Sequence, residues 1–411
     1  MRWTSTPRPR STAWPATSPT TAPRSSSPPP SSRSSCGCAT GSSCCTTGRS
    51  SASSPATRSP STRSCDCPSG GRVSSSTAVA ESPRATGPRR DSSRSDKLID
   101  VVSRYGTIAS LVACIAIFSL LKPDVFATSQ NFFNILNQVS ILGIIALGLT
   151  VALVQGLFDL SLAGMATLGG FLACKWLADG TIGSPAVAVI AVMALALVIG
   201  AFNGVVVAYG GVSAFIVTLA VGSILTGVVL GISDSQTILS GIPDGFLIMG
   251  QGEIGPVPAP VVFLAVVAIV LYVFLEQTQL GRHMYAIGGN AETARLSGIP
   301  VRRYALLALG ISAACAALGG MIVAANLGVG RPQGVGDTYL LDSFAAAFIG
   351  ASTLRPGRFH ILGTVIGVLL IGVINNGLSI MGVETFWQYA VRGIILLLAV
   401  FAASFLVMRR R

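Results

Sequence analysis

The fold is decided most clearly by residues 304–326, which read YALLALGISAACAALGGMIVAAN and contain no charged side chain. A helix needs about 20 mainly apolar residues to cross the hydrocarbon core of a bilayer. This stretch is therefore predicted to be a membrane-spanning helix, and 186–208 and 386–408 are equally clear candidates. The whole chain agrees, since 51% of its 411 residues are hydrophobic and 11% are charged, whereas soluble domains have about 25% charged residues.

Softer apolar runs extend this pattern over the chain from residue 98 onward. They are 106–121, 132–154, 161–177, 212–232, 259–275, 338–351 and 360–380. We therefore predict an all-α, polytopic membrane protein with about ten transmembrane helices, in a permease domain at 98–411. Two of the runs, 161–177 and 338–351, are short and rich in Gly and Ala. That composition favours half-helices buried inside the protein, where irregular backbone is tolerated.

The first 95 residues differ in composition, being mostly Ser, Thr, Pro, Arg, Ala and Gly, with 13 Lys and Arg against 3 Asp and Glu. Such a segment buries too little apolar surface to offset chain entropy and is predicted to be disordered. A zinc module is disfavoured, because Cys36-Gly37-Cys38 and Cys44-Cys45 lack C-x-x-C spacing. A basic tail touching anionic lipid or nucleic acid stays open. The composition favours a mis-assigned start, with GC-rich DNA translated upstream or out of frame.

Basic residues gather in loops that a ten-span topology places on one side of the membrane. They are Arg282, Arg295, Arg302 and Arg303 in 277–303, Arg355 and Arg358 in 352–359, and Arg409, Arg410 and Arg411 at the end. The longest opposite loop, 233–258, has three acidic residues and no basic one. Loops rich in Lys and Arg stay in the cytoplasm. We therefore predict that both termini are cytoplasmic.

Polar side chains in or beside the predicted spans are candidates for the path of a solute. They are Asn137, Gln138, Asp159, Ser161, Asp342, Asn375 and Asn376. Neutral amides with few charges fit a neutral polyol-like solute better than an ion, although an ion- or proton-coupled secondary carrier remains the alternative. Asp159 has a second interpretation, because its carboxylate is placed to accept N–H groups at the start of the following helix.

Motifs for catalysis or cofactor binding are missing from the sequence. It contains no Gly-Lys pair and hence no P-loop for a nucleotide. The two histidines, His283 and His360, are not part of an H-x-x-x-H zinc pattern. We therefore predict no enzymatic activity, no cofactor and no metal site for this chain.

The linker between two predicted spans reads TQLGRHMYAIGGNAETARLSGI at 278–299. Residues 291–297 are predicted to form a short helix, entered from a Gly-Gly-Asn turn and ended by Gly298 as a C-cap. The segment is too short and too polar to cross a bilayer. A short helix held between two spans offers a soluble partner a surface through which to move them.

This linker resembles the coupling loop of the ribose-type ABC permease family, the membrane subunits of importers for ribose, xylose, other sugars and autoinducer-2. The family pattern G-G-N-x-x-x-A-R-L-S-G-I matches at 288–299, D-L-S at 159–161, G-T-x-x-G at 363–367 and N-N-G-L at 375–378. The resemblance implies a permease subunit of an ATP-driven ABC importer for a sugar or similar small polar solute. It also implies two inverted five-helix halves and a place in the bacterial inner membrane.

The resemblance further implies a set of partners. They are a second permease copy in a homodimer, a cytoplasmic ABC ATPase that uses the ATP, a periplasmic or lipid-anchored solute-binding protein, and membrane lipids, with no nucleic acid. The contact with the ATPase would lie at Gly289, Asn290, Glu292, Ala294, Arg295, Leu296 and Gly298. The chain departs from the family at 156–159, 339–342 and 350–357, which leaves the solute open. A binding or scaffold role through the basic tail is a further alternative.

Overall fold

A computed structural model describes residues 94–355, 357–384, 386–391, 393–395 and 397, with side chains from residue 105 onward. The tail expected at 1–95, apart from its last two residues, and most of the span expected at 386–408 lie outside the described residues. The first elements are α1 (Arg94–Leu121), α2 (Pro123–Phe126), α3 (Ser129–Val154), α4 (Leu162–Ala178), α5 (Pro185–Gly210), α6 (Ala214–Ser233), α7 (Asp244–Gln251), β1 (Glu253–Ile254) and β2 (Val257–Pro258). They are followed by α8 (Ala259–Tyr272), the π-helical η1 (Val273–Gln277), α9 (Gln279–Gly289), α10 (Ala291–Leu296), α11 (Val301–Leu327), α12 (Gly336–Ser352) and α13 (Ile361–Ile380).

Helices lie at nine of the ten predicted spans, and the tenth falls mostly outside the described part of the chain. Among the described helices, six are long and apolar enough to cross a membrane: α3, α5, α6, α8 continued by η1, α11 and α13. Tyr105–Leu121 and α4 are apolar but shorter. The predicted all-helical, polytopic character is thus confirmed, with a small exception. Between residues 94 and 397 two short strands, β1 and β2, form an antiparallel hairpin whose turn includes Gly255 at φ +67°.

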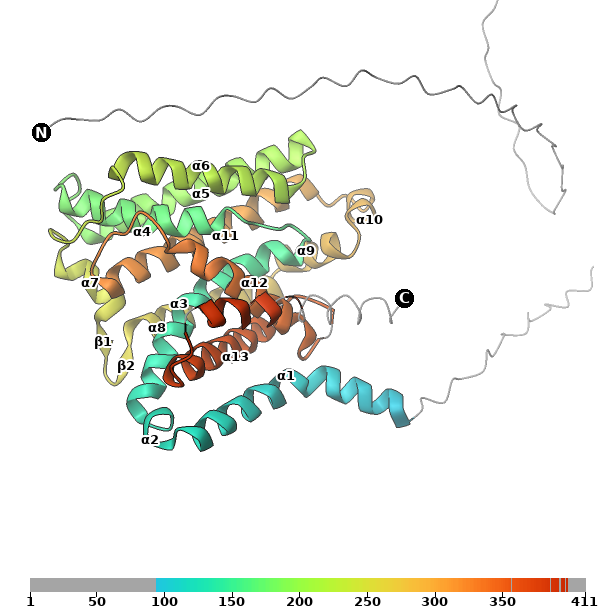
Figure 1. The fold of residues 1–411 in the computed structure, drawn as a ribbon. Helices are drawn as coiled ribbons and strands as arrows, with labels where there is room; N and C mark the ends of the chain where they lie inside the picture. Colours follow the sequence, from blue (N-terminus) through green and yellow to red (C-terminus); the bar gives the residue numbers. More distant parts are fainter. Residues whose placement is uncertain (1–93, 356, 385, 392, 396, 398–411) are drawn as a thin grey trace, which may run out of the picture. The chain divides into compact units, whose positions relative to one another are not determined.

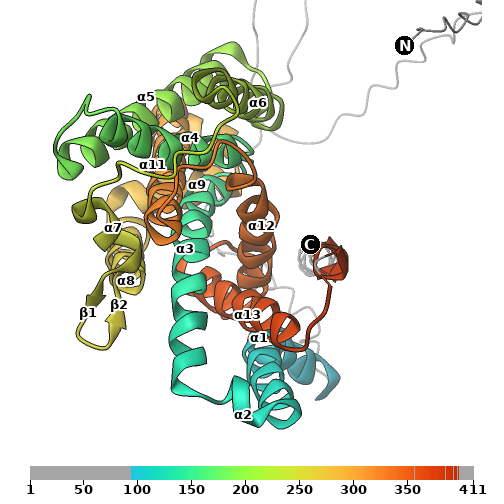
Figure 2. The same cartoon turned by 60° about the vertical axis from the view of Figure 1, so that its left-hand side comes forward.

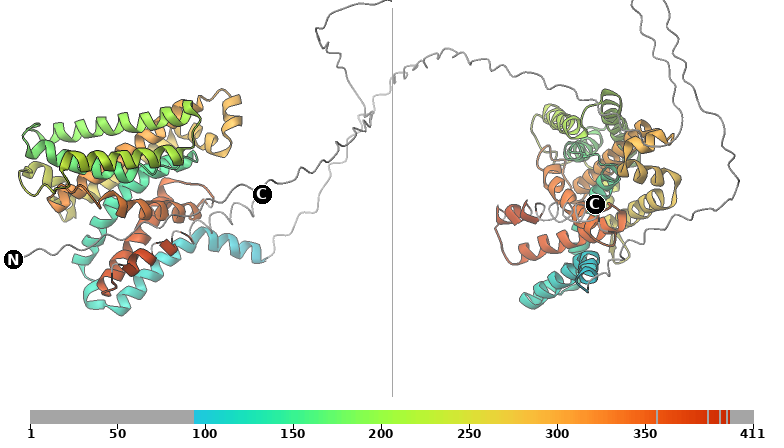
Figure 3. Two further views of the ribbon diagram at one scale, coloured as in Figure 1. Left: turned by 45° about the horizontal axis from the view of Figure 1, so that its top comes forward. Right: turned by 90° about the vertical axis from the view of Figure 1, so that its right-hand side faces the viewer.

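The helices α3 and α11 form the centre of the described fold (Figure 2). In each, 78% of the most apolar window is buried, against 22% in α5 and in α8 with η1. The helix α11 packs against α3, α4 and α5, while α3 packs against α8, α12 and α13. The helices α5 and α6 lie side by side (Figure 3), and many of their large apolar side chains are exposed. In a membrane protein such surface faces lipid, where apolar side chains are the favourable choice.

The short apolar segments at 161–177 and 338–351 appear as α4 and α12. Each has 17 residues, or about 25 Å of helix. Both are largely buried, as expected, since α4 contacts α6, α11 and α12, and α12 contacts α3 and α13. They are nevertheless longer than half of a hydrocarbon core about 30 Å thick. The two helices are short and buried as expected: α4 has the length of its predicted run, α12 is three residues longer than its run, and neither reaches the length of the six helices that could cross a membrane.

Two pairs of glycines allow long helices to approach closely. A Cβ atom on Gly200 would lie 2.5 Å from the Leu309 carbonyl oxygen, and one on Gly204 would lie 2.5 Å from Leu306 Cα. These glycines bring α5 against α11. Gly363 and Gly367 do the same for α13, where added Cβ atoms would collide with backbone oxygens of α12. Small residues are the usual means of close helix packing in membranes.

The short elements of the described fold gather at two ends, with α9 and α10 at one and α7, β1 and β2 at the other (Figure 1). We call one the α10 end, comprising Glu276, α9, α10, the 353–360 loop and the first turn of α11. The other, the α7 end, comprises α7, the β1–β2 hairpin and a backbone bridge between Ile238 and Gly330. The loops at 277–303 and 352–359 lie together at the α10 end, as predicted, since Arg355 of one pairs with Glu276 beside the other.

Candidate functional site

The segment α9–α10 is a helical hairpin with a polar residue at each helix start. The Thr278 hydroxyl accepts the Gly281 N–H at 3.3 Å, and the Asn290 side-chain oxygen accepts the Thr293 N–H at 3.0 Å. Such caps stabilise helix starts by about 1 kcal/mol. Gly298, at φ +83°, follows α10 in the left-handed conformation expected of a C-cap glycine. The short helix predicted at 291–297 is confirmed over Ala291–Leu296.

The predicted Gly-Gly-Asn turn was wrong, because Gly288 and Gly289 are the last residues of the helix α9. Burial of Met284 and Ile287 on one face of α9 favours the helix and offsets the low helix propensity of glycine. Gly288 also packs against the Val154 carbonyl at the end of α3, where no side chain would fit. Sequence reasoning missed α9, since glycines interrupt its pattern.

Most of the predicted contact residues in α10 are exposed. Leu296 is 76% exposed, which is unusual for a leucine. Glu292 and Arg295 form an exposed ion pair with a 2.6 Å N–O distance. This pair lowers the pKa of Glu292 and raises that of Arg295, although such surface pairs contribute little stability. Gly289 and Asn290 are exposed as well. Ala294 is different, because it is 4% exposed and packs in the core, so its side chain offers no surface.

The α10 end is held together by a carboxylate that bonds to two other segments. Arg355 Nη1 lies 2.6 Å from Glu276 Oε2, and the Tyr285 hydroxyl donates to Glu276 Oε1 at 2.9 Å. The Glu276 side chain is 13% exposed, so this pair is better shielded from water than the Glu292–Arg295 pair. Burial, followed by the neighbouring carboxylate, raises the pKa of Tyr285, which remains a donor. Glu276 therefore links η1, α9 and the 353–360 loop.

A second set of bonds joins α9 and α3 to α11. His283 Nδ1 and the Tyr304 hydroxyl are 2.6 Å apart, and Gln155 donates to the Tyr304 carbonyl at 3.0 Å. The Arg302 guanidinium lies 5.1 Å from the centre of the Tyr209 ring at the end of α5, a favourable cation–π distance. A displacement of α9 would therefore act on α11 directly through Tyr304, and on α3 and α5 through their contacts with α11.

Asp159 lies in the break between α3 and α4 and is fully buried. Its Oδ1 atom accepts the backbone N–H and the hydroxyl of Ser161, at 3.0 and 2.6 Å. Asn203 on α5 donates to the Ser161 hydroxyl at 3.0 Å. Thr218 on α6 accepts the Leu160 N–H at 3.0 Å. The break is therefore fixed by side chains from two neighbouring helices, and Asp159 orders the chain at the start of α4.

Three buried atoms in this group have no hydrogen-bond partner among the described residues. They are Asp159 Oδ2, Asn203 Oδ1 and the hydroxyl of Ser312, which approaches Asp159 from α11. An unsatisfied buried polar group costs about 1–3 kcal/mol. Sequence reasoning did not select Asn203, Thr218 or Ser312 for this group. The available signal was a polar side chain within an apolar span, but its facing could not be known.

The other predicted path residues form separate groups. Asn375 donates to Asp342 Oδ2 at 3.0 Å, linking α13 to α12. Asn376 exchanges two bonds with Asn131, at 2.9 and 3.1 Å, linking α13 to the start of α3. Asn137 is half-buried and Gln138 is exposed on α3. Within one chain, the seven predicted residues thus line no single site.

Aromatic rings continue from the Asp159 break along α12. The Phe158 ring is stacked 6.1 Å from Phe344 and 6.4 Å from Phe348, and Phe348 lies 5.3 Å from Phe359. Phe344 and Phe348 are four residues apart and share a helix face. Phe158 is 40% exposed. It therefore presents an apolar ring surface beside the most polar group in the interior.

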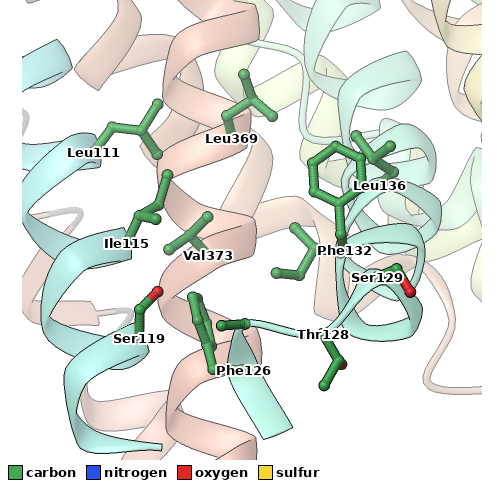
Figure 4. A pocket seen from close by; sticks show the side chains of 12 residues that line it. Leu111, Ile115, Ser119, Phe126, Thr128, Ser129, Phe132, Leu136, Leu369 and Val373 are labelled. Carbon is green, nitrogen blue, oxygen red and sulfur yellow. The ribbon is translucent and has the colours of Figure 1, made fainter. Parts of the chain in front are cut away.

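An apolar cavity of about 460 Å³ lies away from these polar groups, between α1, α2, α3 and α13. Figure 4 shows side chains such as Leu111, Ile115, Phe132 and Leu369 around it. Its few polar atoms come from hydroxyls, for example Ser119. Such a lining suits hydrocarbon and is unlike a path for a polar solute.

Residues 131–400 match the protein family described as branched-chain amino acid transport system / permease component. The chain is similar to the ribose import permease protein RbsC of Escherichia coli strain K12, with 37% identity over 297 residues, covering 72% of this chain and 91% of that protein. It is similar to the D-allose transport system permease protein AlsC of the same strain, with 35% identity over 299 residues, 72% of this chain and 90% of that protein. The xylose transport system permease protein XylH of Haemophilus influenzae is 33% identical over 359 residues, 72% of this chain and 94% of that protein. No solved structure matches the chain.

Proposed function

The chain belongs to the branched-chain amino acid transport system / permease component family, together with sugar ABC permeases, and on that premise we propose that it is the membrane-spanning subunit of an ATP-driven ABC importer. The solute is a sugar or a similar small polar molecule. The choice of a sugar rests on the relatives, whose names specify ribose, allose and xylose. The chain itself hydrolyses nothing and needs no cofactor, because ATP is used by the partner.

The observation that carries this proposal is the α9–α10 hairpin between the spans α8 and α11. Leu296, Glu292 and Arg295 are exposed on α10, where a cytoplasmic ABC ATPase would bind them. Asn290 and Gly298 shape the two ends of α10. Movement of the ATPase would reach α8 and α11 directly, and α12 and α13 through Glu276 and Arg355. This is a coupling of two sites through one movable element.

The proposed topology has ten spans in two inverted five-helix halves. Three helices of each half support it: α3, α4 and α5 belong to the first half of the permease domain, and α11, α12 and α13 belong to the second half. In both sets a long buried helix is followed by a buried 17-residue helix. The pairings also correspond, since α11 packs on α4 and α5 while α3 packs on α12 and α13. Inverted repeats of this kind are common in transporters.

The α10 end is assigned to the cytoplasm, with both termini inside, in the bacterial inner membrane. Six arginines at this end support the assignment: Arg282, Arg295, Arg302, Arg303, Arg355 and Arg358. The α7 end then faces the periplasm, where a periplasmic or lipid-anchored solute-binding protein would dock. Asp234, Asp244 and Glu253 lie in the segment proposed to receive it. The basic residues thus serve topology and lipid contact, and no nucleic-acid partner is proposed.

The solute path is proposed to lie between two copies of the chain. The buried group around Asp159 and Ser161, the Asp342–Asn375 pair, the buried Asn376 and the more accessible Asn137 and Gln138 supply neutral or compensated polar atoms. Phe158 supplies an apolar ring face, on which the C–H face of a sugar could pack. An ion- or proton-coupled carrier is not favoured, because the named relatives are sugar permeases.

Assembly is the direct test of this proposal. The full-length chain should be co-expressed with the ABC ATPase encoded beside it and purified through a tag on the chain. We expect the ATPase to co-purify and a solute-binding protein to bind the reconstituted complex when loaded with a sugar. A chain that transports solute alone in proteoliposomes, without any ATPase, would contradict the proposed function.

A further inference from the structure

A second, smaller cavity lies at the α10 end, where the last turn of η1 meets α9 and the 353–360 loop. It has a volume of about 200 Å³, which exceeds the space of a single water molecule. Unlike the cavity in Figure 4, six of its seven wall residues are polar or charged. The polar wall residues are Glu276, Arg282, Tyr285, Arg355, Arg358 and His360.

The charges in this wall do not balance. Three arginines face one carboxylate, and that carboxylate, Glu276, already pairs with Arg355. Arg282 donates only a long 3.4 Å bond to the Gln277 carbonyl. Neither Arg282 nor Arg358 forms an ion pair with any acidic side chain in the described part of the chain. Arginine stays protonated at physiological pH, so the cavity has an excess of positive charge.

His360 closes one side of the cavity without adding charge to it. Its side chain is 3% exposed and forms part of the cavity wall. Its Nδ1 lies 3.0 Å from the Arg358 carbonyl, while the buried Nε2 has no hydrogen-bond partner among the described residues. Burial, and to a lesser degree the nearby Arg355, lowers the pKa of this imidazole. The Nε2 edge of the ring lies against Gly363 of α13, so a neutral imidazole leaves the arginines to set the charge of the cavity.

The cavity is also placed where a lipid headgroup would reach it. Leu275 and Glu276 of its wall are at the end of the apolar span Ala259–Gln277. Only 22% of the apolar window in that span is buried, so lipid surrounds much of it. The end of such a span marks the boundary between hydrocarbon and headgroups. Basic pockets at the cytoplasmic ends of spans are suited to anionic headgroups.

We propose that this cavity binds a phosphate group. The phosphate oxygens would accept hydrogen bonds from Arg282, Arg358 and the remaining N–H groups of Arg355. Arginine suits this task because its planar guanidinium contacts two phosphate oxygens at once. Two sources have this chemistry: the glycerol headgroup of phosphatidylglycerol and free hydrogenphosphate. Occupancy would tie α9 more firmly to the loop that leads into α13.

The test compares three full-length proteins purified in detergent. They are the wild type, the cavity variant Arg282→Gln/Arg358→Gln, and the control Arg302→Gln/Arg303→Gln, which removes equal charge from the same end outside the cavity wall. Each is titrated with phosphatidylglycerol in mixed micelles and, after delipidation, with inorganic phosphate. Phosphatidylcholine micelles serve as the zwitterionic comparison. Size-exclusion chromatography monitors folding, and the single variant Arg358→Gln replaces the double variant if the latter aggregates.

We expect the cavity variant to bind about thirtyfold more weakly, because two basic contacts are lost, while the control binds like the wild type. Cavity-dependent binding of phosphatidylglycerol alone assigns the site to a lipid headgroup, and cavity-dependent binding of inorganic phosphate assigns it to the free anion. The proposal is overturned if the wild type binds neither ligand, or if the control variant loses as much affinity as the cavity variant. These results do not depend on whether an ATPase binds α10.

Discussion

Glu276 contacts two separate segments at the α10 end and thereby links η1 to α9 and to the 353–360 loop. Arg355 and Tyr285 bond to its two carboxylate oxygens. The Arg355 side chain is 56% exposed while that of Glu276 is 13% exposed, so the pair lies at the edge of the core. In such a place an ion pair contributes modestly to stability but fixes the relative position of two loops.

Charge exchange between these residues tests that link. Glu276→Gln should lower solute-stimulated ATP hydrolysis about fivefold without reducing the amount of ATPase bound, because α10 itself is intact. The double variant Glu276→Arg/Arg355→Glu should recover most of the activity, corresponding to a coupling energy of about 1 kcal/mol. If Glu276→Gln hydrolyses ATP like the wild type, the pair transmits nothing.

Phe158 is the exposed aromatic residue beside Asp159, and it departs from the residue usual in the resembling family. Replacement by isoleucine removes the ring face but keeps an apolar side chain. We expect the KM for solute uptake to rise about threefold to tenfold, since an aromatic contact contributes about 0.5–1.5 kcal/mol, while ATPase association is unchanged. Phe386→Ile, at a 58% exposed aromatic residue elsewhere, is the matched control. Equal KM values in the two variants would remove Phe158 from the path.

At the scale of helices, prediction from sequence succeeded where the signal is local. Runs such as 304–326 predict membrane-spanning helices, because the thickness of the bilayer sets how many apolar residues a span needs. The helix α9 was missed because its formation depends on packing against η1 and α3, as at Gly288. Partners such as Asn203 with Ser161, or Arg355 with Glu276, were also missed. Those contacts join distant parts of the chain, and periodicity carries no information about them.

The close approach of α5 and α11 predicts opposite effects for two similar substitutions. Gly204→Ala places a methyl group 2.5 Å from Leu306 Cα and should destabilise the protein by about 1–3 kcal/mol. Gly227→Ala on α6 meets no atom within 4 Å and should be neutral or slightly stabilising, since alanine is the better helix former. Thermal unfolding in detergent checks both. If the midpoint temperatures of thermal unfolding were equal for Gly204→Ala and Gly227→Ala, α5 and α11 would have to separate at little cost in free energy.

A charge reversal in α10 tests its proposed contact with the ATPase. Arg295→Glu places two carboxylates three residues apart, at positions that now form an ion pair, and reverses the charge offered to the ATPase. We expect association to weaken about thirtyfold or more, while insertion into the membrane remains normal. Co-purification of the ATPase measures the effect, with Arg303→Glu as a charge-matched control. Undiminished co-purification with Arg295→Glu would exclude α10 as the contact.

For the whole molecule, the sequence predicted the grouping of basic loops at one end, and the Glu276–Arg355 pair confirms that the two loops meet. It could not predict which polar groups share a site, because the seven candidate path residues are divided among separate helix contacts. A path that needs two copies of the chain would explain this division, since each copy would contribute one wall. The central claim is therefore about an assembly: solute movement is driven by ATP hydrolysed in a partner that acts through α10.

Solute-stimulated ATP hydrolysis tests that claim most directly. The full-length chain is reconstituted in proteoliposomes with its ATPase and solute-binding protein, and pentoses, hexoses and polyols are added one at a time. We predict that one sugar stimulates hydrolysis and enters the vesicles, and that Arg295→Glu strongly reduces both effects. Solute uptake that continues without ATP, and collapses when an uncoupler dissipates the proton gradient, would contradict the claim and indicate an ion-driven carrier.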